Sequence, residues 1–136
     1  MTPQVLALTH AAAFKTTRPW TVDEFAQLLG TKGVILCGDA KSFTLGRVIL
    51  DEAEVLTLAT HPDFQGRGRA RETLAAFETQ AISAGAETVF LEVAADNEAA
   101  KSLYLSSNFK TIGHRPRYYR DQNGDWIDAI IMQKRL

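Results

Sequence analysis

The chain has 136 residues, of which 46% are hydrophobic and 23% charged, and its net charge is −1. This length allows one hydrophobic core, so we expect residues 1–136 to form a single domain. The near-zero net charge excludes a global electrostatic attraction to nucleic acid or to an anionic membrane. The sequence has neither the roughly 18 consecutive apolar residues of a membrane span nor a basic segment before its first apolar stretch. We therefore expect a cytoplasmic protein.

The N-terminal part of the sequence predicts two helices. Thr2 and Pro3 form an N-cap and first-turn pair, and apolar residues then recur at helical spacing to about residue 14. The segment "TVDE" at 21–24 has the form of a capping box and opens a second helix that ends near Gly30. The loop "KTTRPW" joins the two helices.

Three strand-like runs follow, at 33–38, 43–50 and 54–61. The polar segments between them are short enough for hairpin turns, so the sequence predicts three neighbouring antiparallel strands. Cys37 lies inside the first run and is the only cysteine, so it cannot form an internal disulfide. We interpret it as a small core residue.

The second half of the sequence predicts a βαβ unit and a closing hairpin. A helical period runs over 66–83, an apolar strand pattern over 88–93, and a helix capped by Asn97 comes next. Consecutive strand, helix and buried strand favour a parallel pair. The runs at 109–120 and 125–136 predict the hairpin. The expected fold class is therefore α/β (α+β), one domain with a mixed sheet.

Three arginines, Arg67, Arg69 and Arg71, lie at the predicted start of the third helix, next to Gly66 and Gly68. A helix N-terminus carries positive partial charge, so cations are unfavourable there unless an anion binds. A glycine-rich turn between strand and helix can bind a pyrophosphate through its amides. A plain tight turn with solvated arginines is an equally open interpretation. A Rossmann turn is excluded because Arg71 replaces its third glycine, and no P-loop motif follows.

Glu92 interrupts the strand "TVFLEVAA", which otherwise has the pattern of a strand buried on both faces. A carboxylate in such a place is costly unless it is paired, hydrated or used in proton transfer. A structural ion pair and a functional role are both consistent with this pattern. Tyr104 in the following helix has the spacing of a core aromatic residue, and its phenol could also donate a proton.

Two segments resemble the GNAT acetyltransferases. "QGRGRA" at 65–70 fits the coenzyme A pyrophosphate loop, Gln/Arg-x-x-Gly-x-Gly/Ala, and "LEVAADNEAAKSLYLSSNF" at 91–109 resembles the second half of that fold. With "HAAAF...RPW" and "RPRYYR", these segments are most similar to the bacterial enzymes that acetylate a ribosomal protein at an N-terminal alanine. The resemblance implies a mixed sheet of six to seven strands flanked by about four helices. Members commonly begin with a short strand of the "IRPA" kind, and we expect this edge strand to be missing here.

The resemblance also implies the site residues. Backbone groups on one strand would bind the acetyl-pantetheine arm, namely those of Leu58, Ala59 and Thr60. The pyrophosphate loop would be formed by Gln65, Gly66, Arg67, Gly68, Arg69 and Ala70, and Asn97 would hydrogen-bond the arm. Glu92 would act as general base and Tyr104 would protonate the departing thiolate. The acceptor groove would be walled by the loop at 16–20, with Arg18 and Trp20, and by Tyr118 and Tyr119.

These expectations describe an N-acetyltransferase that uses acetyl-CoA as co-substrate and no metal, acting as a monomer or weak homodimer. An α-amino group has a reference pKa of about 7.7 to 8.0 and a lysine about 10.4, so a single carboxylate neutralises an N-terminal acceptor more easily. We therefore expect a protein or peptide N-terminus as acceptor, with a ribosomal protein as one example. A small amine as acceptor, and a non-catalytic acyl-CoA-binding module, are the alternatives.

Overall fold

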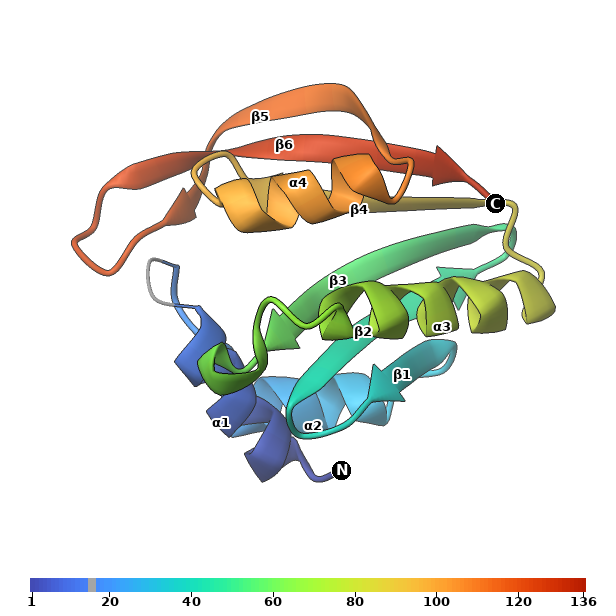
Figure 1. Ribbon diagram of the computed structural model, residues 1–136, viewed down its shortest axis with the longest axis horizontal. Helices are drawn as coiled ribbons and strands as arrows, with labels where there is room; N and C mark the ends of the chain where they lie inside the picture. Colours follow the sequence, from blue (N-terminus) through green and yellow to red (C-terminus); the bar gives the residue numbers. More distant parts are fainter. Residues whose placement is uncertain (15–16) are drawn as a thin grey trace.

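The computed structural model describes residues 1–14 and 17–136. It contains every helix and strand that the sequence predicts, with one short 3-10 helix besides (Figure 1). In chain order the elements are α1 (Pro3–Ala13), α2 (Val22–Leu29), β1 (Val34–Gly38), β2 (Ser42–Ile49), β3 (Glu52–Thr60), η1 (Pro62–Phe64), α3 (Arg69–Ser83), β4 (Thr88–Ala94), α4 (Glu98–Ser106), β5 (Lys110–Arg120) and β6 (Trp126–Arg135). None of the helices in these described residues is long and apolar enough to cross a membrane.

The predicted helix caps of α1 and α2 are confirmed. The Thr2 hydroxyl accepts a hydrogen bond from the Val5 amide, and Thr21 and Glu24 form a reciprocal capping box. The start of α3 differs from the prediction, because the helix begins at Arg69 rather than at residue 66. Gly66 and Gly68 have φ angles of 76° and 78°, in the left-handed region, which a continuous right-handed helix does not allow.

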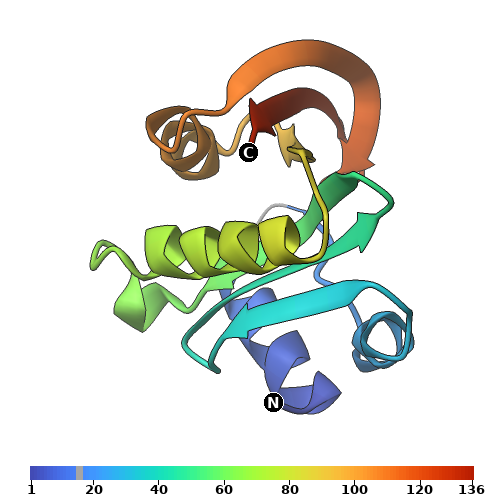
Figure 2. The same ribbon diagram turned by 90° about the vertical axis from the view of Figure 1, so that its right-hand side faces the viewer.

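The six strands form one mixed sheet in the order β1-β2-β3-β4-β6-β5. Only β3 and β4 are parallel, as the βαβ pattern predicts, and α3 connects them. All other neighbouring pairs are antiparallel. In Figure 2, β5 arches over the end of the sheet that β4 and β6 form.

The core has two parts, one on each face of the sheet. The cluster on the α3 face joins β3, β4, β6, α3 and α4; its buried residues are Cys37, Ala53, Val55, Leu74, Phe77, Ala81, Ala86, Val89, Leu91, Val93, Tyr104, Phe109 and Met132. The cluster on the opposite face joins α1 and α2 to β2 and β3; its buried residues are Leu6, Phe25, Phe43, Leu45 and Ala59. Cys37 is buried in the first cluster, as predicted.

A one-residue bulge in β3 places this strand in both cores. The pairing with β2 passes from Val55 directly to Thr57, which leaves Leu56 as the extra residue. Val55 is buried on the α3 face, whereas Ala59 is buried under α1 and α2. Residues four apart in a regular strand would share one face. The pairing with β4 ends at Val55 and Leu91, so the two parallel strands diverge from this point (Figure 1).

The expectation that β4 is buried on both faces is wrong. Burial alternates along the strand, so that Val89, Leu91 and Val93 are buried while Phe90 and Glu92 are only partly covered. The reason is the position of the helices. Within the described residues, the core under α1 and α2 contains no residue of β4, so this face of β4 lacks a covering helix.

Candidate active site

A cleft of about 1090 Å³ lies where β3 and β4 diverge. It is lined by residues of α1, β3, β4, α4 and β5 and by the loop before α3. All but one of the site residues predicted from the sequence line it: Arg18, Trp20, Leu58, Ala59, Thr60, Gln65, Gly66, Gly68, Arg69, Ala70, Glu92, Asn97, Tyr104, Tyr118 and Tyr119. The exception is Arg67. The fold therefore brings together residues that are up to about a hundred positions apart in the sequence.

The edge of β3 beyond the bulge faces the cleft without a strand partner on the β4 side, because the β3–β4 pairing ends at Val55. Leu58 and Ala59 lie on this unpaired stretch, as the sequence predicts for residues that bind an extended arm. Thr60 already forms hydrogen bonds within the protein. Its carbonyl oxygen accepts a hydrogen bond from Gln65 Nε2 at 3.0 Å, and its hydroxyl is 2.8 Å from the Ser42 hydroxyl. Thr60 and Gln65 thus fix the start of the loop to the end of β3.

The loop before α3 has room for a ligand next to its backbone. A Cβ added to Gly66 or to Gly68 would meet no atom within 4 Å. Their left-handed φ angles and this open space fit a turn that a phosphate approaches closely. The conformation and the free space, rather than tight packing, therefore account for glycine at these two positions.

The arginines of this loop have protein partners as well. Lys41, Arg67 and Arg69 surround the Phe64 ring, with their charged groups 5.0, 5.5 and 5.7 Å from its centroid. Arg69 also forms an ion pair with Asp39 at 3.3 Å. An aromatic face attracts cations, which offsets part of their repulsion from the helix N-terminus. The Arg67 guanidinium therefore lies at the Phe64 ring and does not line the cleft, and its predicted part in cofactor binding stays a prediction.

Asn97 caps α4, as the sequence predicts, because its Oδ1 accepts a hydrogen bond from the Ala100 amide at 3.1 Å. This leaves the side-chain NH₂ group as the donor that could reach a bound arm. Arg71 donates a hydrogen bond to the Ser106 hydroxyl at 2.8 Å. This bond links the first turn of α3 to the last turn of α4, and both residues line the cleft.

Glu92 is held by two residues of β5. Arg115 Nε is 3.2 Å from Glu92 Oε1, and the Glu92 side chain is 15% exposed. The adjacent Glu92 carboxylate is the main reason that the pKa of the Tyr118 phenol is raised, and burial contributes to the same shift. Tyr119 donates to the backbone carbonyl of Glu92 at 3.3 Å. The structural ion pair considered for Glu92 is therefore present, and Glu92 also lines the cleft, where its functional role stays a prediction.

Tyr104 is 6% exposed and packs edge-to-face on Phe109, with 5.6 Å between the ring centroids. Burial raises the pKa of its phenol, and the nearby Tyr119 raises it further. The phenol consequently keeps its proton over the whole physiological pH range and can only donate to an anion in the cleft. Tyr104 is therefore a core aromatic residue, as predicted, and its phenol stays the predicted proton donor.

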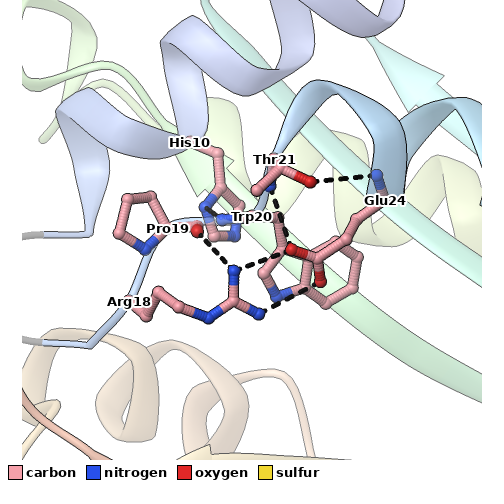
Figure 3. Close-up of polar contacts among 6 residues, drawn as sticks. All are labelled: His10, Arg18, Pro19, Trp20, Thr21 and Glu24. Atoms are coloured by element: carbon pink, nitrogen blue, oxygen red, sulfur yellow. Dashed lines mark hydrogen bonds and ion pairs between the residues drawn. The ribbon is translucent and has the colours of Figure 1, made fainter.

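The acceptor-side loop, which is the loop predicted to wall the acceptor groove, is held by polar contacts of Arg18 and Trp20, whereas Thr16, also part of that prediction, lies outside the described residues. Arg18 forms two contacts with the Glu24 carboxylate, at 2.7 and 3.1 Å, and donates to the Pro19 carbonyl (Figure 3). The Trp20 amide donates to His10 Nδ1 at 3.1 Å. These contacts attach the loop to α1 and α2.

A sequence profile of the Acetyltransferase (GNAT) family matches residues 14–109. The chain belongs to the GNAT acetyltransferases. It is accordingly an acetyl-CoA-dependent N-acetyltransferase, and the expected GNAT fold with a six-stranded mixed sheet is confirmed.

Relatives with known names are similar over most of this GNAT chain. The [Ribosomal protein bS18]-alanine N-acetyltransferase of Escherichia coli is 35% identical over 118 residues, which are 84% of this chain and 79% of that protein. The enzyme of the same name from Haemophilus ducreyi is 37% identical over 67% of this chain and 63% of its own length. The crystal structure of the Escherichia coli ribosomal-protein-S18-alanine N-acetyltransferase superposes with a TM-score of 0.86 and 30% identity, over 98% of this chain and 86% of that one.

One buried residue of the GNAT cleft, His10, was missed by the sequence reasoning. His10 is 2% exposed, stacks on Phe14 and has its Nε2 3.0 Å from the Thr57 hydroxyl. Burial lowers its pKa to about 4, against a smaller opposing effect of Glu24. Its sequence context is that of an ordinary helical residue, and its partners are 10 and 47 positions away, so no local pattern identifies it.

Glu54 and Arg115 were also missed as site residues. Glu54 lines the cleft from β3, and Arg115 reaches Glu92 from β5. The sequence predicts that β3 and β4 are parallel but leaves their register open, and the register brings Glu54 beside Phe90. No group of three or more histidine, cysteine, aspartate or glutamate side chains suited to a metal ion is present within 1–14 and 17–136.

Proposed function

We propose that this GNAT enzyme acetylates the N-terminal α-amino group of a protein, with Glu92 as general base and Tyr104 as proton donor. The observation that carries the proposal is their common position. Glu92 on β4 and Tyr104 on α4 line one cleft, and the loop suited to a pyrophosphate lines the same cleft. The bS18-alanine N-acetyltransferases, which are similar over most of the chain, support a protein N-terminus with alanine as acceptor. A ribosomal protein as acceptor implies action in the cytoplasm.

The fold offers acetyl-CoA a continuous binding path. The unpaired edge at Leu58 and Ala59 would hydrogen-bond the pantetheine arm as a further strand, and the Asn97 amide would donate to it. The amides at Gly66 to Ala70 and the N-terminus of α3 would bind the pyrophosphate, and Arg69 lies at the same turn. The thioester would then lie between Glu92 and Tyr104.

The reaction is a direct transfer. Glu92 removes one proton from the α-ammonium group, and the neutral nitrogen attacks the thioester carbonyl. Glu92 passes this first proton to solvent. A carbon–nitrogen bond forms, the nitrogen gives its second proton to Glu92, and the carbon–sulfur bond breaks, so that the coenzyme A thiolate takes a proton from the Tyr104 phenol. Solvent returns the proton to Tyr104. An α-ammonium group with a pKa of about 7.7 to 8.0 demands little of the base, so a carboxylate held by Arg115 suffices.

Acceptor profiling tests the proposal. The enzyme is incubated with acetyl-CoA and three acceptors: a peptide with N-terminal alanine, the same peptide with a blocked N-terminus and an internal lysine, and a polyamine. Released thiol is the readout. We expect the free α-amine to give the highest kcat/KM and the blocked peptide to give none. Preference for the polyamine would instead assign a small-molecule acceptor, and a rise in Tm with acetyl-CoA but no turnover would assign a non-catalytic binding module.

A further inference from the structure

A second carboxylate, Glu54, lines the cleft beside the proposed general base. Val55 and Leu91 pair across β3 and β4, and both are buried on the α3 face. Side chains alternate along a strand. Glu54 precedes Val55 by one residue and Glu92 follows Leu91 by one residue, so both carboxylates point to the opposite face, where the cleft opens.

Glu54 is only partly compensated by positive charge. Its ion pair with Arg47 is long, at 3.5 Å, and its side chain remains 25% exposed. Arg47 Nη2 donates the long bond to Glu54, and among the described residues Arg47 Nε is buried without a hydrogen-bond partner. Burial raises the pKa of Glu54, and Glu92 raises it further, against the opposing effect of Arg47.

The other charged and titratable groups near Glu54 come from β5. Tyr118 is close enough that both Glu54 and Glu92 raise its pKa. Arg115 pairs with Glu92 and lies over the Tyr118 ring, 5.4 Å from its centroid. The guanidinium of Arg115 therefore pairs with Glu92, whereas within the described residues the ion pair of Glu54 is the long one with Arg47, which does not line the cleft.

We propose that Glu54 binds the α-ammonium group of the incoming N-terminus before Glu92 removes its proton. The inference rests on the proposed function. An ammonium group has three N–H donors, and two carboxylates on one face of adjacent strands can each accept one of them. At neutral pH most α-amino groups are protonated, so a carboxylate that binds an ammonium group binds the predominant form of the acceptor. Glu54 thus contributes to acceptor binding, and Glu92 to proton transfer.

The test compares Glu54→Gln with Glu52→Gln, an exposed carboxylate two residues earlier on the same strand. With an N-terminal alanine peptide we expect Glu54→Gln to raise the peptide KM about tenfold, because a hydrogen bond between charged groups is lost, and to change kcat little. The Kd for acetyl-CoA should stay at the wild-type value. Glu52→Gln should match the wild type throughout. The KM difference should shrink as pH rises above the acceptor pKa, because a neutral amine no longer needs a counter-charge.

Arg47→Met separates acceptor binding from a merely structural pairing. If Glu54 served only to pair Arg47, Arg47→Met would raise the peptide KM as Glu54→Gln does, and that outcome overturns the inference. We expect the peptide KM of Arg47→Met to equal or fall below the wild-type value. An unchanged KM in Glu54→Gln, with an active wild type, overturns this inference alone. A wild type that acetylates no peptide overturns the proposed function and this inference together.

Discussion

His10 Nδ1 accepts a hydrogen bond from the backbone amide of Trp20 at 3.1 Å. An amide nitrogen can only donate, so Nδ1 carries no proton and the neutral ring has its proton on Nε2, which faces the Thr57 hydroxyl at 3.0 Å. One imidazole therefore connects the acceptor-side loop to β3 one residue beyond the bulge at Leu56. The bond from Trp20 requires the neutral form of His10, because a protonated Nδ1 cannot accept a hydrogen bond.

Acidification should destabilise the protein through His10. Burial lowers the folded-state pKa to about 4, whereas an unfolded histidine has a pKa of about 6.5. The unfolded state therefore binds the proton first, and stability falls as pH drops from about 6.5 to about 4, by about 3 kcal/mol over the whole window. Thermal unfolding at about pH 7.5 and about pH 5 measures the effect. His10→Gln, which cannot titrate, should lose this pH dependence. His61→Gln is the matched control, and an equal loss of the pH dependence of stability in that variant would contradict the assignment to His10.

Gly68→Ala should weaken acetyl-CoA binding while the protein still folds. A Cβ at Gly68 meets no atom within 4 Å, so the free energy of unfolding should fall only by the cost of the left-handed φ of 78°, about 1 to 2 kcal/mol. The methyl group would occupy space that a phosphate needs. Gly46→Ala is the contrasting variant, because its Cβ would lie 2.4 Å from the Glu54 carbonyl and from the Phe77 ring. It should unfold the protein. Circular dichroism and acetyl-CoA titration distinguish the two effects, and unchanged affinity in Gly68→Ala would favour a plain turn.

Glu92→Gln should lower turnover by roughly ten- to ten-thousand-fold, near the usual range for loss of a general base. The rate difference should shrink as pH approaches the acceptor pKa. The stability cost should stay below about 1 kcal/mol, because the partner Arg115 is 55% exposed and such ion pairs contribute little. Kinetics with peptide and acetyl-CoA, together with the Tm, make the measurement. Wild-type turnover in this variant would remove Glu92 from the mechanism.

Tyr104→Phe should slow transfer by at least about tenfold and leave the acetyl-CoA affinity unchanged. Phenylalanine keeps the edge-to-face packing on Phe109, so the Tm should change little. The ring alone is retained, and the proton donor is lost. Single-turnover thiol release measures the step directly. If Tyr104→Phe released thiol at the wild-type rate, the thiolate would have to be protonated by solvent.

The sequence predicted those parts of the fold that depend on local patterns. The capping box at Thr21 and Glu24 and the Asn97 cap are made by residues three positions apart, and both were correct. The GNAT motif likewise placed Glu92 and Tyr104 in one cleft. Burial of β4 was predicted wrongly because an apolar composition does not reveal which face a helix covers.

His10 and Glu54 escaped prediction for a related reason. The role of His10 depends on Thr57, 47 positions away, and that of Glu54 on the register between β3 and β4. A pattern of apolar residues specifies that strands pair, but the offset between them is decided by packing across the whole sheet. Contacts that depend on such an offset therefore become visible only in the folded chain.

The bulge at Leu56 shapes the cleft through the course of the main chain rather than through side chains. If the strand alternated regularly through Leu56, the side chains of Thr57 and Ala59 would turn toward α3, and His10 would lose its hydroxyl partner. The edge proposed to bind the pantetheine arm is thus made of β3 backbone atoms that no substitution removes. The side chains around it, including Glu54, Arg115 and Tyr118, are free to diverge and to adapt one scaffold to different acceptors while the donor stays the same.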